Sequence, residues 1–310
     1  EVATCKGVLS GGLYTYQGTT TYGHISGCHF HDCCDIPTTR GSGPAVLINN
    51  TQNVLFENSV VAFNAATYGG IRLATAGTVR NCLVYGNHAS RADAGGGLTQ
   101  SGGLVESCTI AANSAVAADA MGAYVTGGTM RNSIIANNGE HIMLFGDANL
   151  KRTGGTVEYC CTYPLPDGGS GNIDANPLLA NPSLGDYSLL PVSPCRDAGV
   201  NQMWMTDAKD LGGIRDRKVN DTVDIGAYEL DIAANMPFGC YFLIPPAIGD
   251  TNTVFTFNAL TYGEPGMIDG YAWSFGDSQT ASGPETSHRY TTYSSGFDVI
   301  LTVTSGDFVV

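Results

Sequence analysis

Hydrophobic and polar residues alternate in short runs over the first half of the chain, and one such run recurs. Its copies span residues 25–30, 58–61, 79–84, 105–110, 130–135 and 157–161. A cysteine or serine marks each copy, at positions 28, 59, 82, 108, 133 and 160, so the steps are 31, 23, 26, 25 and 27 residues. A nearly constant period in this range predicts one supersecondary unit that stacks on itself.

Strand alternation assigns the side chains of each copy to two faces. The positions expected to face inward are Ser59, Val61, Cys82, Val84, Cys108, Ile110, Ser133 and Ile135. The positions between them are also apolar, notably Val60, Leu83, Tyr85 and Ile134. Such an outer face predicts a covering element. We expect these four residues to pack against a protein partner or a second copy of the chain; the alternative is cover by a loop or the C-terminal segment of the same chain.

Asparagine and glycine recur with the same period. An asparagine lies five residues after the marker in four copies, where stacked amides can bond to the backbone of the next turn. These asparagines are Asn64, Asn87, Asn113 and Asn138. Glycines at 69–70, 95–97 and 122 precede the next strands and let the chain turn between sheets. The pattern predicts an all-β chain in which residues 1–165 form a single-stranded parallel β-helix of five to six turns.

The phrase Val-x-Asn-Cys-x-Val at 79–84, with the triple glycine at 95–97, resembles the right-handed parallel β-helix family. That family includes pectate-lyase-like enzymes, phage tailspikes and many bacterial surface proteins. The resemblance implies a right-handed helix, and either a surface role or action on polysaccharides.

Residues 166–232 are richer in proline and aspartate. Several phrases there follow one another in a fixed order, from Asn-Pro-Leu-Leu at 176–179 through Ser-Pro-Cys-Arg-Asp-Ala-Gly at 193–199 to Asp-Ile-Gly-Ala-Tyr-Glu at 224–229. Their order resembles the C-terminal signature of choice-of-anchor Q proteins, which follows β-helix repeats and precedes a sorting or adhesion module. We expect an irregular cap over the last turn, held by an ion pair of Arg215 with Asp210 or Asp224.

Residues 233–310 have the pattern of a second, sandwich-like domain. The stretch Gly-Tyr-Ala-Trp-Ser-Phe-Gly-Asp-Ser at 270–278 resembles the PKD (polycystic kidney disease) domain, an immunoglobulin-like β-sandwich of secreted bacterial proteins. Ser274 and Ser278 replace two residues of the usual family phrase Trp-Asp-Phe-Gly-Asp-Gly. The two replacements leave no support for a binding role of this loop. Trp273 and Phe275 alternate as core residues, which favours the fold.

Composition and charge narrow the classes of function. The 310 residues include 41 glycines and carry a formal net charge of −14. The acidic balance argues against nucleic-acid binding and against anionic membrane surfaces. No apolar run reaches the ~20 residues of a membrane span, so no membrane insertion is expected. No cofactor is expected apart from Ca²⁺, which aspartate and asparagine oxygens can hold. Because the chain starts at Glu1, we expect a processed product or an excerpt.

The ten cysteines fall into two groups. Those at the marker position are expected to be small buried side chains. The others are better candidates for disulfides, namely Cys5, Cys33, Cys34, Cys161, Cys195 and Cys240. The spacing of paired cysteines that a structural zinc site requires does not occur.

Few residues suggest chemistry. His29, His31 and Asp32 are the weak candidates for a metal site, because two histidines two apart share a strand face, although packing or surface roles are the more common alternative. Lys151 and Arg152 are the weak catalytic candidates, as the one paired basic site on which a polysaccharide lyase could rely. Acidic residues of 51–150 do not repeat at one position of the turn, as a glycosidase pair would require.

The sequence therefore predicts a secreted or cell-surface bacterial protein with a structural or adhesive role, which associates with itself or with a protein partner. The alternative is a carbohydrate-active enzyme, a lyase or hydrolase, or a carbohydrate-binding protein.

Overall fold

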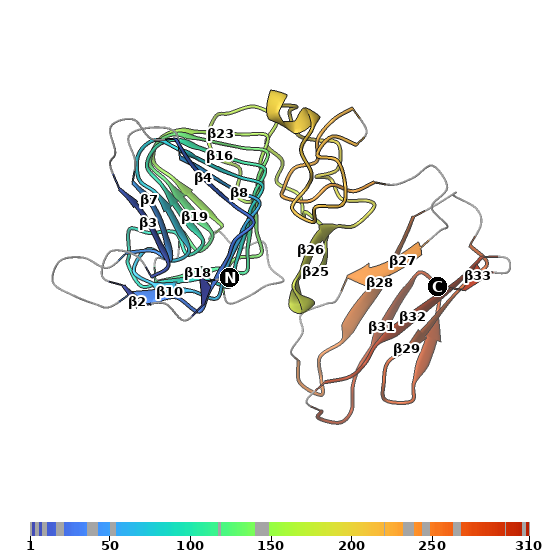
Figure 1. The fold of residues 1–310 in the computed structure, drawn as a ribbon. Helices are drawn as coiled ribbons and strands as arrows, with labels where there is room; N and C mark the ends of the chain where they lie inside the picture. The colour runs from blue at the N-terminus through green and yellow to red at the C-terminus, as the bar shows by residue number, and fades with distance from the viewer. Residues whose placement is uncertain are drawn as a thin grey trace. The chain divides into compact units, whose positions relative to one another are not determined.

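The computed structural model describes most of the chain (Figure 1). The described residues are 2–3, 6–7, 11–16, 22–35, 43–49, 54–116, 119–139, 149–219, 221–231, 239–243, 249–262, 268–294, 296–305 and 308–309. They divide into two compact units, Glu1–Asp231 and Ile232–Val310, which are considered separately below.

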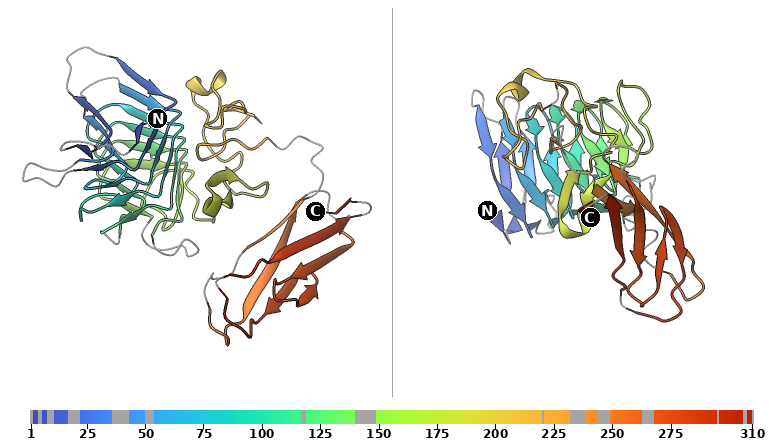
Figure 2. Two further views of the ribbon diagram at one scale, coloured as in Figure 1. Left: turned by 60° about the horizontal axis from the view of Figure 1, so that its bottom comes forward. Right: turned by 90° about the vertical axis from the view of Figure 1, so that its right-hand side faces the viewer.

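The first unit contains a parallel β-solenoid. Successive turns contribute strands to four sheets, so strands from neighbouring turns lie side by side (Figures 1 and 2). We number the sheets I to IV in the order in which they are visited by a turn that begins at β4 (Gly23–Ser26). Sheet I consists of β4, β8 (Val54–Glu57), β12 (Thr78–Arg80), β16 (Leu104–Glu106), β20 (Thr129–Arg131) and β23 (Thr156–Glu158). Sheet II consists of β1 (Val2–Ala3), β5 (His29–His31), β9 (Val60–Ala62), β13 (Leu83–Tyr85), β17 (Thr109–Ala111), β21 (Ile134–Ala136) and β24 (Cys161–Thr162).

The remaining two sheets complete each turn. Sheet III consists of β2 (Lys6–Gly7), β6 (Cys34–Asp35), β10 (Ala65–Ala66), β14 (His88–Ala89) and β18 (Ser114–Ala115). Sheet IV consists of β3 (Leu13–Tyr16), β7 (Val46–Asn49), β11 (Ile71–Leu73), β15 (Leu98–Gln100), β19 (Ala123–Val125) and β22 (Leu150–Arg152). The predicted all-β fold and stacked parallel turns are thus confirmed.

The interior of the solenoid is formed by the side chains predicted to face inward. Val61, Val84, Ile110 and Ile135 stack in register on successive strands of sheet II. These branched side chains and the marker residues from Ser59 to Cys160 are fully buried, whereas the first marker, Cys28, is partly buried against the same core. The marker cysteines of the described turns are free thiols, so they pack as small apolar groups, as predicted.

A left-handed residue produces the bend between sheets I and II in each turn. The bend residues have φ between 49° and 53°, and they are Asn58, Asn81, Ser107, Asn132 and Tyr159. Asparagine tolerates this backbone conformation better than most other side chains, which accounts for its frequency immediately before the marker.

The predicted asparagine ladder is present at the bend between sheets II and III. The Oδ1 atoms of Asn87, Asn113 and Asn138 each accept hydrogen bonds from both the backbone N–H and the side-chain amide of the asparagine one turn before. The ladder continues from Asn138 to Asn149, whose Oδ1 atom accepts from the Asn138 backbone N–H at 3.0 Å. Because the ladder residues are buried, each amide replaces bonds that water would otherwise make.

Residues 166–231 were expected to form a cap over the last turn. They also extend that turn and return along the solenoid. Ile173 forms a parallel bridge with Cys161, and the Ser170 carbonyl accepts from the Tyr159 N–H at 2.8 Å, so these residues extend the final turn. The following chain contains β25 (Leu179–Asn181), the 3₁₀ turn η1 (Pro182–Leu184), β26 (Asp186–Leu189) and the 3₁₀ turn η2 (Met203–Thr206). We call residues 177–231 the covering segment, because they return along the outer face of sheet II.

The second unit consists of two antiparallel sheets that share one core. One sheet contains β27 (Gly239–Leu243), β28 (Phe255–Tyr262) and β31 (Glu285–His288). The other contains β29 (Gly270–Ser274), β30 (Thr280–Ser282), β32 (Ile300–Ser305) and β33 (Phe308–Val309). Trp273 and Phe275 are both buried in this core, as their alternation predicts, and the Trp273 indole N–H donates to the Gly283 carbonyl at 2.9 Å.

Candidate functional site: the covered face of sheet II

The outer face of sheet II, where the sequence predicts a partner, is occupied by the covering segment. The Ala227 N–H donates to the Thr109 hydroxyl at 3.0 Å, and the Gly226 N–H donates to the Asn132 carbonyl at 2.8 Å. Leu83 and Ile134 are 4% and 0% exposed beneath this segment. These two residues are therefore covered by the same chain, which was the alternative, and neither is accessible to a protein partner. Val60 and Tyr85 are partly buried.

Two asparagines at the bend between sheets I and II bind the covering segment. The Asn132 amide donates to the Val200 carbonyl at 2.8 Å and accepts from the Val200 N–H at 2.8 Å. The Asn81 amide donates to the Lys209 carbonyl at 3.0 Å. The repeat therefore supplies side chains that hold the segment as well as residues that shape the turn.

Aromatic rings close the edge of this contact. Tyr187 of β26 is buried and lies with its ring centroid 5.0 Å from that of Tyr85. Phe63 lies on the other side of Tyr85, at 4.9 Å between ring centroids, and is 55% exposed. Burial raises the pKa of the Tyr85 and Tyr187 hydroxyls, so both stay neutral at physiological pH.

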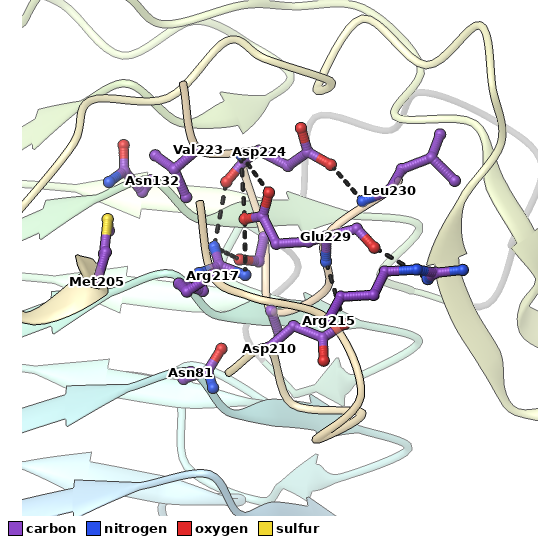
Figure 3. Close-up of polar contacts among 12 residues, drawn as sticks. Asn81, Asn132, Met205, Asp210, Arg215, Arg217, Val223, Asp224, Glu229 and Leu230 are labelled. Carbon is purple, nitrogen blue, oxygen red and sulfur yellow. Dashed lines mark hydrogen bonds and ion pairs between the residues drawn. The ribbon is translucent and has the colours of Figure 1, made fainter. Parts of the chain in front are cut away.

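A charged cluster lies at the centre of the covering segment (Figure 3). The Arg217 guanidinium is fully buried, lies 3.2 Å from a Glu229 carboxylate oxygen and donates to the Asp224 carbonyl at 3.1 Å. The Asp224 carboxylate accepts from the backbone N–H groups of Asp197 and Leu230, both at 2.7 Å. One buried arginine and two buried carboxyl groups therefore fix the path of three separate parts of the segment.

Burial dominates the electrostatics of this cluster. Desolvation raises the pKa of Asp224 to about 6 and that of Glu229 to about 9, despite the opposing attraction of Arg217. Desolvation also lowers the pKa of Arg217. Shifts of this kind occur in active sites as well as in structural networks. Here the carboxyl groups are 1–2% exposed and bind backbone N–H groups, so the arrangement is suited to holding the segment in place.

The expected ion pair of Arg215 with Asp210 or Asp224 is wrong, because Arg217 lies in the cluster instead. The Arg215 guanidinium donates to the Glu229 carbonyl at 3.0 Å, and its own carbonyl accepts from the Asp210 N–H, in place of the expected carboxylate pair. Arg217 is the arginine that lies beside a buried carboxyl group, that of Glu229. Both arginines lie in one polar stretch, and the sequence carries no signal that separates them.

The acidic residues of sheet I are committed to a ladder of alternating charge. Glu57, Arg80, Glu106 and Arg131 occupy one register position on successive strands. The expectation that acidic residues do not recur at one position of the turn is therefore wrong for Glu57 and Glu106. The Arg80 Nε atom lies 2.6 Å from a Glu57 oxygen, and Arg131 lies 3.0 Å from a Glu106 oxygen. The Arg80 guanidinium also stacks on Trp204 of η2, at 4.4 Å from the ring centroid. This ladder holds the covering segment as well as the sheet.

The weak catalytic candidates Lys151 and Arg152 make structural contacts. The Lys151 ammonium lies 2.7 Å from an Asp119 oxygen, and this contact raises the pKa of Lys151, which opposes a role as a base. Arg152 donates to the Gly155 carbonyl at 2.8 Å and to the Asp167 carbonyl. The two side chains thus belong to the last turn of the solenoid.

The weak metal candidates lie together on β5 and the bend that follows it. The His29 and His31 rings are 4.7 Å apart between centroids, and His31 Nδ1 lies 2.8 Å from an Asp32 oxygen. Within the described ranges, no group of three or more His, Cys, Asp or Glu side chains has the arrangement of a metal site.

Comparison with known proteins identifies the second unit. A family model of the PKD domain matches residues 243–308. Curated proteins and solved structures gave no significant match. PKD domains usually occur in extracellular proteins. In the part of the chain that the structure describes, no helix has the length and apolar character required to span a membrane. A parallel β-solenoid with a PKD domain fits an extracellular structural or adhesive protein in general terms.

Proposed function

We propose that this chain is a secreted or cell-surface bacterial protein in which the solenoid is a stiff structural or adhesive element that associates with further copies of itself. The observation that carries the proposal is the ladder of alternating charge on sheet I. Glu57 and Glu106, which a hydrolase could have used as a carboxylate pair, are partnered by Arg80 and Arg131. The choice-of-anchor Q resemblance at 176–229 supports a surface location.

Self-association would use the ends of the solenoid, since the covering segment occupies the outer face of sheet II. Terminal strands of parallel sheets present backbone groups that pair with a further strand. In this chain β22 is the last strand of sheet IV. The last strand of sheet I, β23, is already covered, because the Asn172 amide donates to the Val157 carbonyl at 2.9 Å. A head-to-tail contact of this kind adds copies in one direction.

Light scattering coupled to size-exclusion chromatography tests the proposal on the full chain. The expected mass exceeds the 32.3 kDa of one chain and rises with concentration. A mass of one chain at every concentration contradicts self-association. Release of unsaturated or reducing-end products from polygalacturonate or alginate contradicts a purely structural role.

Carbohydrate binding is the second candidate, favoured by the exposed ring of Phe63 beside Tyr85. Aromatic faces of this kind stack on sugar rings. Retention of the chain on insoluble polysaccharides should fall for Phe63→Ala and not for Tyr293→Ala, which removes an 82% exposed ring from the second unit. Equal retention of both variants and the unmodified chain contradicts this candidate.

A further inference from the structure

Two buried cysteines meet where the covering segment contacts the last turn of the solenoid. Cys161 is in β24, in register with the outward-facing Ile134, so its thiol faces the covering segment. Its neighbour Cys160 has the opposite orientation and belongs to the inner core. Cys195 is fully buried within the covering segment.

The backbone holds Cys195 over this strand. The Cys195 carbonyl accepts from the Ile225 N–H at 2.8 Å, and the next residue, Gly226, binds the Asn132 carbonyl. On the other side, the Ser193 hydroxyl donates to the Pro177 carbonyl at 2.6 Å, and the Cys161 thiol donates to the Ala175 carbonyl at 3.2 Å. Interaction with the neighbouring Cys195 side chain is the largest cause of the raised pKa of Cys161.

We propose that Cys161 and Cys195 form a disulfide bond that joins the covering segment to the last turn of the solenoid. The two thiols lose two protons and two electrons, and a disulfide oxidant such as oxidised glutathione takes them up as two thiols. The bond closes a loop from residue 161 to residue 195 and so restricts the unfolded chain. Only the supply of oxidant rests on the extracellular location proposed above; the pairing rests on the contact.

The bond forms during folding rather than in the finished structure. Both thiols are fully buried, and contact with Cys195 together with burial raises the pKa of Cys161. Thiolate is the species that attacks a disulfide, so the folded, reduced chain reacts slowly. The unfolded chain exposes both thiols at their ordinary reactivity.

Peptide mapping tests the pairing directly. The full chain is refolded in a buffer of oxidised and reduced glutathione, blocked with N-ethylmaleimide and cut with trypsin and a protease that cleaves before aspartate. These cuts separate peptide 153–166, which contains Cys160 and Cys161, from peptide 186–196, which contains Cys195. The expected product is the joined pair with one maleimide on Cys160. Apart from that added maleimide, it is about 2 Da lighter than the sum of the two free peptides.

Two variants identify the cysteine in the first peptide. Cys161→Ser should abolish the joined pair, whereas Cys160→Ser should retain it, since serine already occupies the equivalent core positions at Ser59 and Ser133. The same peptide mapping can be done on chain that has been exported to a bacterial periplasm, where it folds and oxidises without a refolding step. Recovery of the two peptides separately from folded chain after either route, or a bond from Cys161 or Cys195 to any other cysteine, overturns the proposal. These results are independent of light scattering and product release, so they separate a failed pairing from a failed function.

Discussion

Asn132 and Val200 exchange two hydrogen bonds, each 2.8 Å long, between the solenoid and the covering segment. Asn132 has a left-handed backbone with φ 49°, and its side chain is buried. Asn132 therefore forms a bend of the solenoid with its backbone. With its side chain it bonds the backbone N–H and carbonyl of Val200, as a neighbouring strand would. The predictions below depend on this double use of the repeat.

Asn132→Gly should destabilise the first unit by about 2 kcal/mol, because it removes two hydrogen bonds worth about 1 kcal/mol each while allowing the left-handed backbone. Ser107→Gly is the matched control. Ser107 has the same conformation one turn earlier, with φ 53°, and its hydroxyl has no hydrogen-bond partner among the described residues. Urea denaturation measures both variants. Equal losses for the two would show that the contact with Val200 contributes nothing.

Asn113→Ala should cost about 3 kcal/mol or more, because two donors of Asn87, the backbone N–H and the side-chain amide, lose the Asn113 Oδ1 acceptor. The Asn87 backbone N–H would remain buried without its partner, whereas the side-chain amide would keep its bonds to the Val61 and Tyr85 carbonyls, at 2.9 and 3.0 Å. Asn137→Ala serves as the control, since the equivalent residue one turn earlier is Ala112 with the same φ of 55°. A shift in urea midpoint no larger than that of the control would contradict the ladder's contribution.

Gly226→Ala should loosen the covering segment. Gly226 has φ 112°, and an added Cβ would lie 2.8 Å from Ile134 Cδ1 and 3.0 Å from the Thr109 hydroxyl. Gly213→Ala carries a similar backbone cost, with φ 72°, but meets no atom within 4 Å. Limited proteolysis within 177–231 should be faster for Gly226→Ala than for Gly213→Ala. Identical cleavage rates would argue against close packing of the segment on sheet II.

Glu229 should make stability depend on pH. Its folded pKa of about 9 exceeds the ordinary value of 4.5, so the folded state retains a proton that the unfolded state loses. The free energy that this proton contributes to the folded state is fully present below pH 4.5 and is lost as the pH rises toward 9. Relative to Glu229→Gln, the unfolding free energy of the unmodified chain should fall by up to about 1.4 kcal/mol per pH unit between pH 5 and 8. Urea midpoints that stay parallel over this range would contradict the burial of this carboxyl group.

The periodic part of the fold could be predicted from the sequence because each turn repeats the same physical requirements. The marker position needs a small buried side chain, the residue before it tolerates a left-handed backbone, and Asn87 or Asn113 needs an amide. The covered face was also visible, since residues such as Leu83 and Ile134 are apolar on the side that faces away from the core.

The covering segment could be predicted only as irregular chain. Its contacts join residues far apart in sequence, as in the pair of Thr109 with Ala227, and no period relates them. The buried role of Arg217 rather than Arg215 depends on this tertiary path. Asn149 likewise joins the ladder without the spacing that identifies its other members.

Hydrogen–deuterium exchange of the full chain tests most directly whether the covering segment is an integral part of the solenoid. Backbone N–H groups of Ile225, Gly226 and Leu230 are hydrogen-bonded and buried. Peptides covering 223–230 should therefore exchange as slowly as those from β13, β17 and β21. The exposed turn at 212–214 provides the fast control. Exchange of 223–230 at the rate of that turn would contradict the account and would leave the face of sheet II open to a partner.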